Sequence, residues 1–356
     1  MNIQEHVPLA PLTTLGVGGE ARFFVSAQSS EEVAEALAFA RANSLPVFML
    51  GGGSNILIAD TGFNGLVIAV RMQGIKEEMH SDRTQITVGA GVIWDELVVW
   101  TIEHGYIGLE CMSGVPGTVG GAVVVNLGCY GAQCSDTFIQ AEVLDTQDQR
   151  NEIKIMKKEE CNFSYHESMF SQSPGRYLVL QVTFSLSTSG TSRLSYRDNR
   201  FDLEALATAS GHEPTLKDVR TAILKMRGEK GMLSGYYKSA GSFFHMPFVP
   251  EEKYADVMRR ARKLDAKKEE RLRPWAWKQP DGSYKVAPGF LLEYTEFQKG
   301  YVRGEVGISP RHTLSLINVG HASARDIMEF ARAMQDAVEK VFGIHLEREV
   351  EYIGEV

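Results

Sequence analysis

Glycine is concentrated in the first half of this 356-residue chain, where roughly 19 of the 34 glycines precede residue 132. Two runs stand out, Gly51-Gly52-Gly53-Ser54-Asn55 and Gly117-Thr118-Val119-Gly120-Gly121. Glycine permits tight turns and close approach of the backbone to a ligand, and successive backbone N–H groups can form concave anion sites. We therefore expect the two runs to form turns that bind one pyrophosphate from both sides through backbone N–H groups. The alternative is that both are tight turns with a structural role only.

These glycines match neither of two common nucleotide signatures. No GxGxxG follows the first predicted strand, and no GxxxxGK[S/T] is present. A Rossmann fold and a P-loop are therefore not expected.

Strand-like and helix-like patterns are mixed along the chain, which predicts an α+β fold. Strands are expected at 22–25, 47–50, 56–58, 66–70, 84–88, 138–145, 177–186 and 345–352, and helices at 29–43, 93–104, 215–227, 250–268 and 323–342. The segments 56–58 and 66–70 are expected to extend the sheet that 47–50 begins. The charge-dense run 265–273 is interpreted as a solvated face.

Composition narrows the class of protein. The formal net charge of −8 disfavours a general nucleic-acid binder, and no apolar run is long enough for a membrane span. The four cysteines form no CxxC pair, so we expect no metal site. Few cysteines and no secretory signal pattern favour a cytoplasmic protein.

Six segments, in order, resemble the motifs of one flavoenzyme family. They are Thr13–Gly19 (TTLGVGG), Leu50–Leu57 (LGGGSNIL), Gly114–Ala122 (GVPGTVGGA), Asn126–Gly131 (NLGCYG), Ser239–Phe244 (SAGSFF) and Leu346–Val350 (LEREV). Together they are similar to the UDP-N-acetylenolpyruvoylglucosamine reductases, the MurB family, and most closely to its type I members. The resemblance covers nearly the whole chain.

The resemblance implies a two-part FAD-binding module of the vanillyl-alcohol-oxidase (PCMH) type and a C-terminal α+β substrate domain. The first FAD subdomain is expected to comprise residues 1–72, and a C-terminal strand within 345–356 is expected to return to it. Residues 73–230 would form the second subdomain and 231–344 the substrate domain. The implied reaction is NADPH-dependent reduction of UDP-N-acetylglucosamine enolpyruvate to UDP-N-acetylmuramate for peptidoglycan. Hydride passes through FAD to C3, and C2 is then protonated.

The resemblance also implies which residues hold the cofactor. They are Gly51, Gly52, Gly53, Ser54, Asn55, Gly114, Pro116, Gly117, Thr118, Gly120, Gly121, Ala122, Asn126, Gly128 and Tyr130. No His or Cys matches a covalent flavin linkage, so non-covalent FAD is expected. The implied partners are this cofactor, NADPH and the UDP-sugar substrate, with no nucleic acid or membrane and a monomeric state.

Two residues match the family's catalytic segments. Ser242 matches the proton donor to C2, although the residues alone favour a serine in a turn before two core phenylalanines. Glu349 matches the catalytic glutamate near the C-terminus. Strand alternation places Glu347, Glu349 and Glu351 on one solvated face, so only the resemblance singles out Glu349.

Three further residues match the family's substrate contacts. Lys230 matches a lysine that meets the nucleotide phosphates, with a plain surface lysine as the alternative. Tyr165 matches a substrate-contacting tyrosine, and Tyr196 matches one on a mobile loop that closes over the UDP group. A half-buried strand position is the alternative for both tyrosines.

Three positions depart from the family pattern, all at expected substrate contacts. His166 stands where an arginine would stabilise the enolate, Met246 replaces an asparagine, and Tyr294 replaces a glutamine. We assign His166 to catalysis and Met246 and Tyr294 to substrate binding. The departures leave two alternatives open: a related FAD enzyme with another substrate, such as an oxidase, and a non-catalytic FAD or UDP-sugar-binding protein.

Overall fold

The computed structural model describes residues 1–198, 200–209, 211–264, 267, 270 and 272–354. The chain forms two compact units. Unit 1 comprises Met1–Pro8, Glu20–Gly53 and Phe63–Gly228, and unit 2 comprises Leu9–Gly19, Ser54–Gly62 and Glu229–Val356. Both contain helices and sheets, so the α+β fold class is confirmed. The division into three domains stays a prediction.

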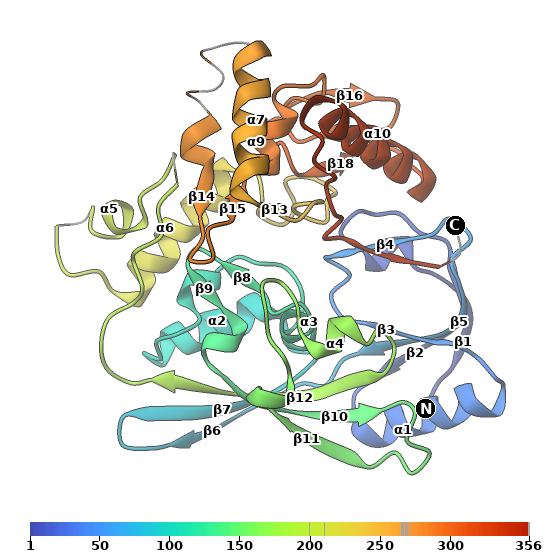
Figure 1. Cartoon of the computed structure of the whole chain (residues 1–356). Coiled ribbons are helices and arrows are strands. Elements are labelled where there is room, and N and C mark those ends of the chain that lie inside the picture. The colour runs from blue at the N-terminus through green and yellow to red at the C-terminus, as the bar shows by residue number, and fades with distance from the viewer. Residues whose placement is uncertain (199, 210, 265–266, 268–269, 271, 355–356) are drawn as a thin grey trace. The chain divides into compact units, whose positions relative to one another are not determined.

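The first sheet of unit 1 has four strands in the order β1–β2–β5–β3 (Figure 1). Their bounds are Gln4–Pro8, Glu20–Ala27, Phe63–Val70 and Val47–Leu50. Strands β2 and β3 both run parallel to β5, and helix α1 (Ser30–Ala42) packs against β2 and β5. The helix begins where Ser29 Oγ accepts the N–H of Glu32 at 3.2 Å, as the sequence predicts.

The second sheet of unit 1 is antiparallel, in the order β11–β10–β12–β7–β6. The strands are Ile153–Lys157, Phe138–Asp145, Tyr177–Ser187, Arg83–Gly89 and Ile75–Met79. Helices α2 (Trp94–Glu103), α3 (Val119–Val124) and α4 (Met169–Gln172) cover one face (Figure 1). Trp94 is fully buried there, packs edge-on against Phe184 and donates its indole N–H to Met112 O at 3.1 Å. Unit 1 also contains β8 (Gly128–Cys129), β9 (Ala132–Gln133), α5 (Leu203–Ala207) and α6 (Leu216–Glu229).

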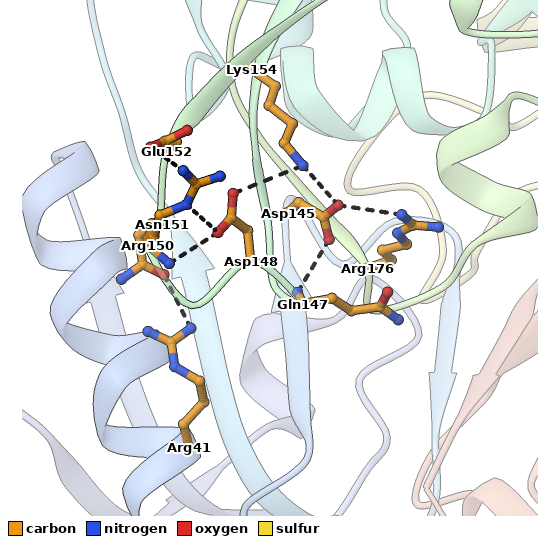
Figure 2. A network of polar contacts seen from close by, with 9 residues as sticks. All are labelled: Arg41, Asp145, Gln147, Asp148, Arg150, Asn151, Glu152, Lys154 and Arg176. Atoms are coloured by element: carbon orange, nitrogen blue, oxygen red, sulfur yellow. Dashed lines mark hydrogen bonds and ion pairs between the residues drawn. The ribbon is translucent and has the colours of Figure 1, made fainter.

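A polar network joins β10, β11 and β12 at one end of this sheet (Figure 2). Asp145 is nearly buried, and its Oδ2 accepts from Lys154 at 3.2 Å and from Arg176 at 3.4 Å. Burial alone would raise the pKa of Asp145, but the hydrogen bonds from Arg176 and Lys154 outweigh it and lower the pKa. Asn151 in the β10–β11 turn accepts from Arg41 of α1 at 3.0 Å, so the network also reaches the first sheet's helix.

This network predicts a stability effect at Asp145. Asp145→Asn should lower the free energy of unfolding by about 1–3 kcal/mol at pH 7, because the buried carboxylate that accepts hydrogen bonds from two exposed cations, Lys154 and Arg176, loses its charge. Because the folded-state pKa is depressed, the contribution is full above about pH 4 and disappears as pH falls through the folded pKa. Urea unfolding at pH 7 measures the loss of stability, and urea unfolding at pH 3 tests whether the difference between variant and parent disappears. The matched control is Glu152→Gln, an exposed member of the same network, for which a change below about 0.5 kcal/mol is expected. Equal effects of the two substitutions would contradict the account.

The described residues of unit 2 form three small sheets. The strands β13 (Phe248–Val249), β15 (Tyr284–Val286) and β14 (Ala276–Lys278) form one antiparallel sheet, and β16 (Val302–Arg303), β17 (Val306–Ile308) and β18 (Leu316–Asn318) form another. The third pairs β4 (Ile56–Ile58) with β19 (Glu351–Ile353) in parallel. The prediction that 56–58 extends the first sheet is therefore wrong, because its partner lies near the C-terminus.

Helix α10 (Ala324–Phe342) covers the core of unit 2, together with α7 (Glu251–Leu264) and α9 (Pro288–Leu292). Ser323 caps α10 in a reciprocal box with Asp326, and Gly343 ends it at φ 63°; the helix predicted at 323–342 is confirmed with nearly the same bounds. The described part of helix α7 runs from Glu251 to Leu264, within the predicted 250–268; most of the remainder of that prediction and much of the charged run 265–273 lie outside the described residues. Among the described helices, none combines the length and apolar character needed to span a bilayer.

The strand predicted at 345–352 is shorter and lies later, at Glu351–Ile353. Residues before it make isolated contacts instead, such as the bridge between Phe244 and Arg348. The alternation argument that grouped Glu347, Glu349 and Glu351 on one face therefore does not hold.

Candidate active site

The two glycine-rich turns of unit 1 lie against one another. A Cβ atom on Gly52 would fall 2.6 Å from Gly117 Cα, and one on Gly51 would fall 2.8 Å from Thr118 Oγ1. Such distances are too short for any side chain, so both positions require glycine because of the facing turn. Gly53 and Gly117 also have positive φ, at 64° and 123°. The sequence prediction that the turns act together agrees with this contact.

The backbone N–H groups of the second turn are largely used inside the protein. Val119 N–H donates to Val92 O and Gly120 N–H donates to Ala90 O, both at 2.9 Å, while Gly121 N–H reaches Thr118 Oγ1 at 3.4 Å. The expected open run of donors over Gly117–Gly121 is therefore wrong, since these bonds anchor α3 to the sheet. A pyrophosphate would have to rely on the first turn and on the donors at the start of the second.

A charged pair fixes the beginning of the second turn. Asp95 of α2 accepts from Gly114 N–H at 2.6 Å and forms a two-bond pair with Arg220 of α6 at 2.6 and 2.8 Å. Burial would raise the pKa of Asp95, but the Arg220 and Gly114 hydrogen bonds lower it. The loop that holds Gly114 and Pro116 is thus tied to two helices.

The other predicted cofactor residues follow directly along unit 1. Ala122 lies in α3, and Gly128 opens β8. Asn126 is buried at φ 42°, where its side chain accepts from Ser135 N–H at 3.0 Å and donates to Ser164 O at 2.7 Å. The side chain of Asn126 therefore supports the loop at Ser164.

That loop carries two predicted substrate residues. Ser164 N–H donates to Glu167 O at 3.0 Å, which closes a tight turn with Tyr165 and His166 at its tip. The two rings meet edge-on at 4.4 Å, and His166 has φ 53°. A non-glycine residue in the left-handed region is uncommon and concentrates at functional sites.

A predicted cofactor residue and a predicted substrate residue also meet in unit 1. Tyr130, at φ 50°, is nearly buried, and its ring contacts that of Tyr196 edge-on at 5.1 Å. Burial raises the pKa of Tyr130 to about 12 and also raises the pKa of Tyr196, whose hydroxyl donates to Asp198 at 2.9 Å. Both phenols therefore stay protonated at neutral pH.

Unit 2 brings the two predicted catalytic segments together. Glu349 N–H donates to Phe243 O at 3.0 Å, and His245 N–H donates to Glu347 O at 2.9 Å. Phe243 and Phe244 are both buried, which anchors the segment after Ser242 in the core. On the other side, Ser242 bridges to Ser315. The segment that carries Ser242 therefore lies between Ser315, which directly precedes β18, and the segment that carries Glu349.

The Glu349 carboxyl lies in an unusual electrostatic setting. Burial raises its pKa to about 7, and the positive charge of Lys285 on β15 acts in the opposite direction. His245 Nδ1 lies 3.9 Å from Glu349 Oε2. A carboxyl group poised near neutrality beside two basic side chains is typical of acid–base sites.

The remaining predicted residues also lie in unit 2. Lys230 is buried, so the surface-lysine alternative is wrong. Buried lysines are rare and have functional or structural charge partners. Tyr294 packs edge-on against Phe342 at 5.4 Å, while Met246 and Ser54 are half-buried.

Two residues beside Glu349 were not identified from the sequence. His245 follows the Ser242 motif directly, so its position next to SAGSFF was an available signal. Lys285 lies in a three-residue strand opposite Phe248 and Trp277, and nothing in the local sequence marks it. Among the described residues, no group of three His, Cys, Asp or Glu side chains is placed to hold a metal ion.

Comparison with protein families identifies two matching models. One, described as an FAD binding domain, matches residues 21–150, and the other, the C-terminal domain of UDP-N-acetylenolpyruvoylglucosamine reductase, matches residues 234–353. Curated relatives with that name are similar along their whole length. The protein from Thermobifida fusca is 36% identical over 355 residues, covering 98% of this chain and 97% of the relative. The one from Pseudomonas aeruginosa is 35% identical, with 98% of each covered.

A solved structure of the same kind matches the fold. The UDP-N-acetylenolpyruvylglucosamine reductase (MurB) of Thermus caldophilus superimposes with a TM-score of 0.66 at 25% identity, covering 99% of this chain and all of the other.

Proposed function

The chain belongs to the UDP-N-acetylenolpyruvoylglucosamine reductase family, FAD-dependent oxidoreductases of peptidoglycan precursor synthesis, and we propose which of its residues carry that reaction. The glycine-rich turns hold FAD, and Ser242 and Glu349 serve the reduction of the substrate. The contact between the Ser242 and Glu349 segments, made by Glu349 N–H and Phe243 O, carries this assignment.

The glycine-rich turns of unit 1 fit a bound dinucleotide. Side chains are excluded where Gly52 meets Gly117, which leaves backbone surface there, and the Asp95–Arg220 pair fixes the adjoining loop. Gly51 to Ser54 and Gly114 to Ala122 would hold the pyrophosphate, and Tyr130 and Gly128 would line the remainder of the site. FAD, when bound without a covalent link, supplies hydride obtained from NADPH.

Reduction of the enolpyruvyl double bond adds a hydride to C3 and a proton to C2. Ser242 is proposed to give the C2 proton. Serine is a weak acid, so the fixed position of its segment must carry much of the effect. The hydroxyl is replenished from water, and the balance is one NADPH and one proton consumed per UDP-N-acetylmuramate formed.

Glu349 is proposed to stabilise the developing negative charge. In its protonated form, the carboxyl group donates a hydrogen bond to the substrate carboxylate as charge builds there. His166, where the family pattern has arginine, would provide a second donor from the Tyr165 turn. The buried Lys230 would meet the phosphates, and Tyr165, Tyr196, Met246 and Tyr294 would contact the rest of the UDP-sugar.

The pKa of Glu349 predicts a pH dependence. Because burial raises it to about 7, the proton-bearing form is complete below that value and is lost as pH rises through it. The rate of substrate reduction should therefore fall above about pH 7. Glu349→Gln, which keeps a donor but cannot ionise, should remove this inflection while lowering the maximum rate. Single-turnover rates from pH 5.5 to 8.5 measure both.

His245 is the necessary control, because its Nδ1 lies 3.9 Å from Glu349 Oε2. His245→Gln should retain the inflection. An inflection that survives in Glu349→Gln and vanishes in His245→Gln would contradict the assignment.

Product analysis tests the proposed substrate. Purified protein with NADPH and UDP-N-acetylglucosamine enolpyruvate should give a product heavier by two hydrogens, with NADPH consumed in equal amount. His166, Met246 and Tyr294 favour one alternative, a related enzyme that reduces or oxidises another substrate. That alternative predicts no new product, and an oxidase would consume oxygen instead.

We further infer that the enzyme acts as a cytoplasmic monomer on small molecules. The acidic net charge and the use of NADPH support this inference.

A further inference from the structure

Asn55 holds the backbone of Glu349. Its side-chain amide donates to Glu349 O at 3.2 Å, and its own carbonyl accepts from Glu351 N–H at 3.1 Å. The two contacts continue the parallel pairing of β4 and β19, in which Glu351 lies opposite Ile56. Asn55 therefore forms hydrogen bonds with the residues on both sides of Val350, namely Glu349 and Glu351.

The Glu349 peptide is fixed from two directions. Its N–H donates to Phe243 O, in the residue after Ser242, and its C=O accepts from Asn55. The Phe243 bond sets the distance between the Glu349 and Ser242 segments. The Asn55 bond prevents the peptide from turning about that contact, so it also directs where the side chain of Glu349 points.

The sequence motif gave Asn55 a different role, as a cofactor residue of the Gly51–Asn55 run. Yet one of its two amide hydrogens is already donated within unit 2, to the backbone of Glu349. We propose that Asn55 is a positioning residue, whose side chain orients Glu349 toward the negative charge that develops during substrate reduction. This inference rests on the proposed function.

The expected effect is confined to one half of the reaction. Asn55→Ala and the equally sized Asn55→Asp both remove the amide donor. Each should slow reoxidation of the reduced enzyme by substrate about 10–10²-fold, because a small misplacement of a reacting group costs about that much. FAD content and the rate of flavin reduction by NADPH should stay within about twofold of the parent enzyme.

A double-mutant cycle tests whether the effect passes through Glu349. If it does, Asn55→Ala combined with Glu349→Ala, which removes the positioned side chain, should be no slower than the slower single variant. Hydrogen exchange gives a readout independent of activity, in which the segment 345–353 should exchange faster in Asn55→Ala. Asn64→Ala, at an exposed asparagine, is the matched control and should change nothing.

Two results would overturn the proposal. One is loss of FAD in both Asn55 variants while the remaining holoenzyme is reoxidised at the parent rate, which would make Asn55 a cofactor ligand. The other is a double variant whose slowing equals the product of the single effects. If the parent enzyme itself is not reoxidised by substrate, the proposed function fails and the positioning role has no reaction to serve.

Discussion

Ser242→Ala is expected to leave flavin reduction by NADPH nearly intact and to slow reoxidation by substrate about 10²–10⁴-fold, the usual effect of losing a positioned acid. Only the second half of the reaction adds a proton to C2. The buried rings of Phe243 and Phe244 keep the segment in place, so the substitution removes a hydroxyl group without displacing its neighbours. Anaerobic stopped-flow absorbance separates the two half-reactions.

Ser189→Ala, at an exposed serine in unit 1, serves as the control and should match the parent in both half-reactions. If Ser242→Ala slows both half-reactions equally, the role of Ser242 is structural and Ser242 is not the proton donor to C2. If neither changes, the protein binds FAD without this turnover.

Gly52→Ala is expected to remove most of the bound flavin. The new Cβ would lie 2.6 Å from Gly117 Cα, and a backbone atom cannot move aside as a flexible side chain can. Overpacking of this kind costs about 1–3 kcal/mol. At about 1.4 kcal/mol per tenfold, the upper end of that range corresponds to roughly 100-fold weaker FAD binding. Titration of apoprotein with FAD, followed by flavin fluorescence, measures the change.

Gly289→Ala is the matched control, because a Cβ there would meet Leu314 and Thr313 at ordinary contact distances of 3.5 Å. It should bind FAD as the parent does. If Gly52→Ala also binds FAD normally, the contact between the two glycine turns is not what shapes the cofactor site.

Local signals in the sequence were sufficient for much of the fold. Ser323 and Gly343 mark the two ends of α10 by their capping chemistry, and the strand 47–50 is predicted with the bounds observed. Each of these depends on a few neighbouring residues. The pairing of β4 with β19 does not, because its partners come from opposite ends of the chain. Because of that pairing, residues 56–58 belong to a separate sheet and not, as predicted, to the first one.

In the candidate site, too, some features follow from neighbouring residues and others depend on residues that are distant in the sequence. The glycine motifs locate the cofactor turns, but which backbone donors remain available depends on Ala90 and Val92, far from the motif in sequence. Glu349 resembles Glu347 and Glu351 in the sequence; burial raises the pKa of both Glu349 and Glu351, and only the fold places Lys285 and His245 beside Glu349. Lys285 has no local signature at all, since its importance comes from the charge that it places near Glu349.

The most direct test of the proposed reaction is anaerobic. The purified protein is reduced with one equivalent of NADPH, and UDP-N-acetylglucosamine enolpyruvate is then added while the flavin absorbance is followed. The account predicts rapid return of the oxidised flavin spectrum, with UDP-N-acetylmuramate formed in equal amount. A flavin that stays reduced until oxygen is admitted would contradict it, and would direct attention to the substrates that His166, Met246 and Tyr294 fit instead.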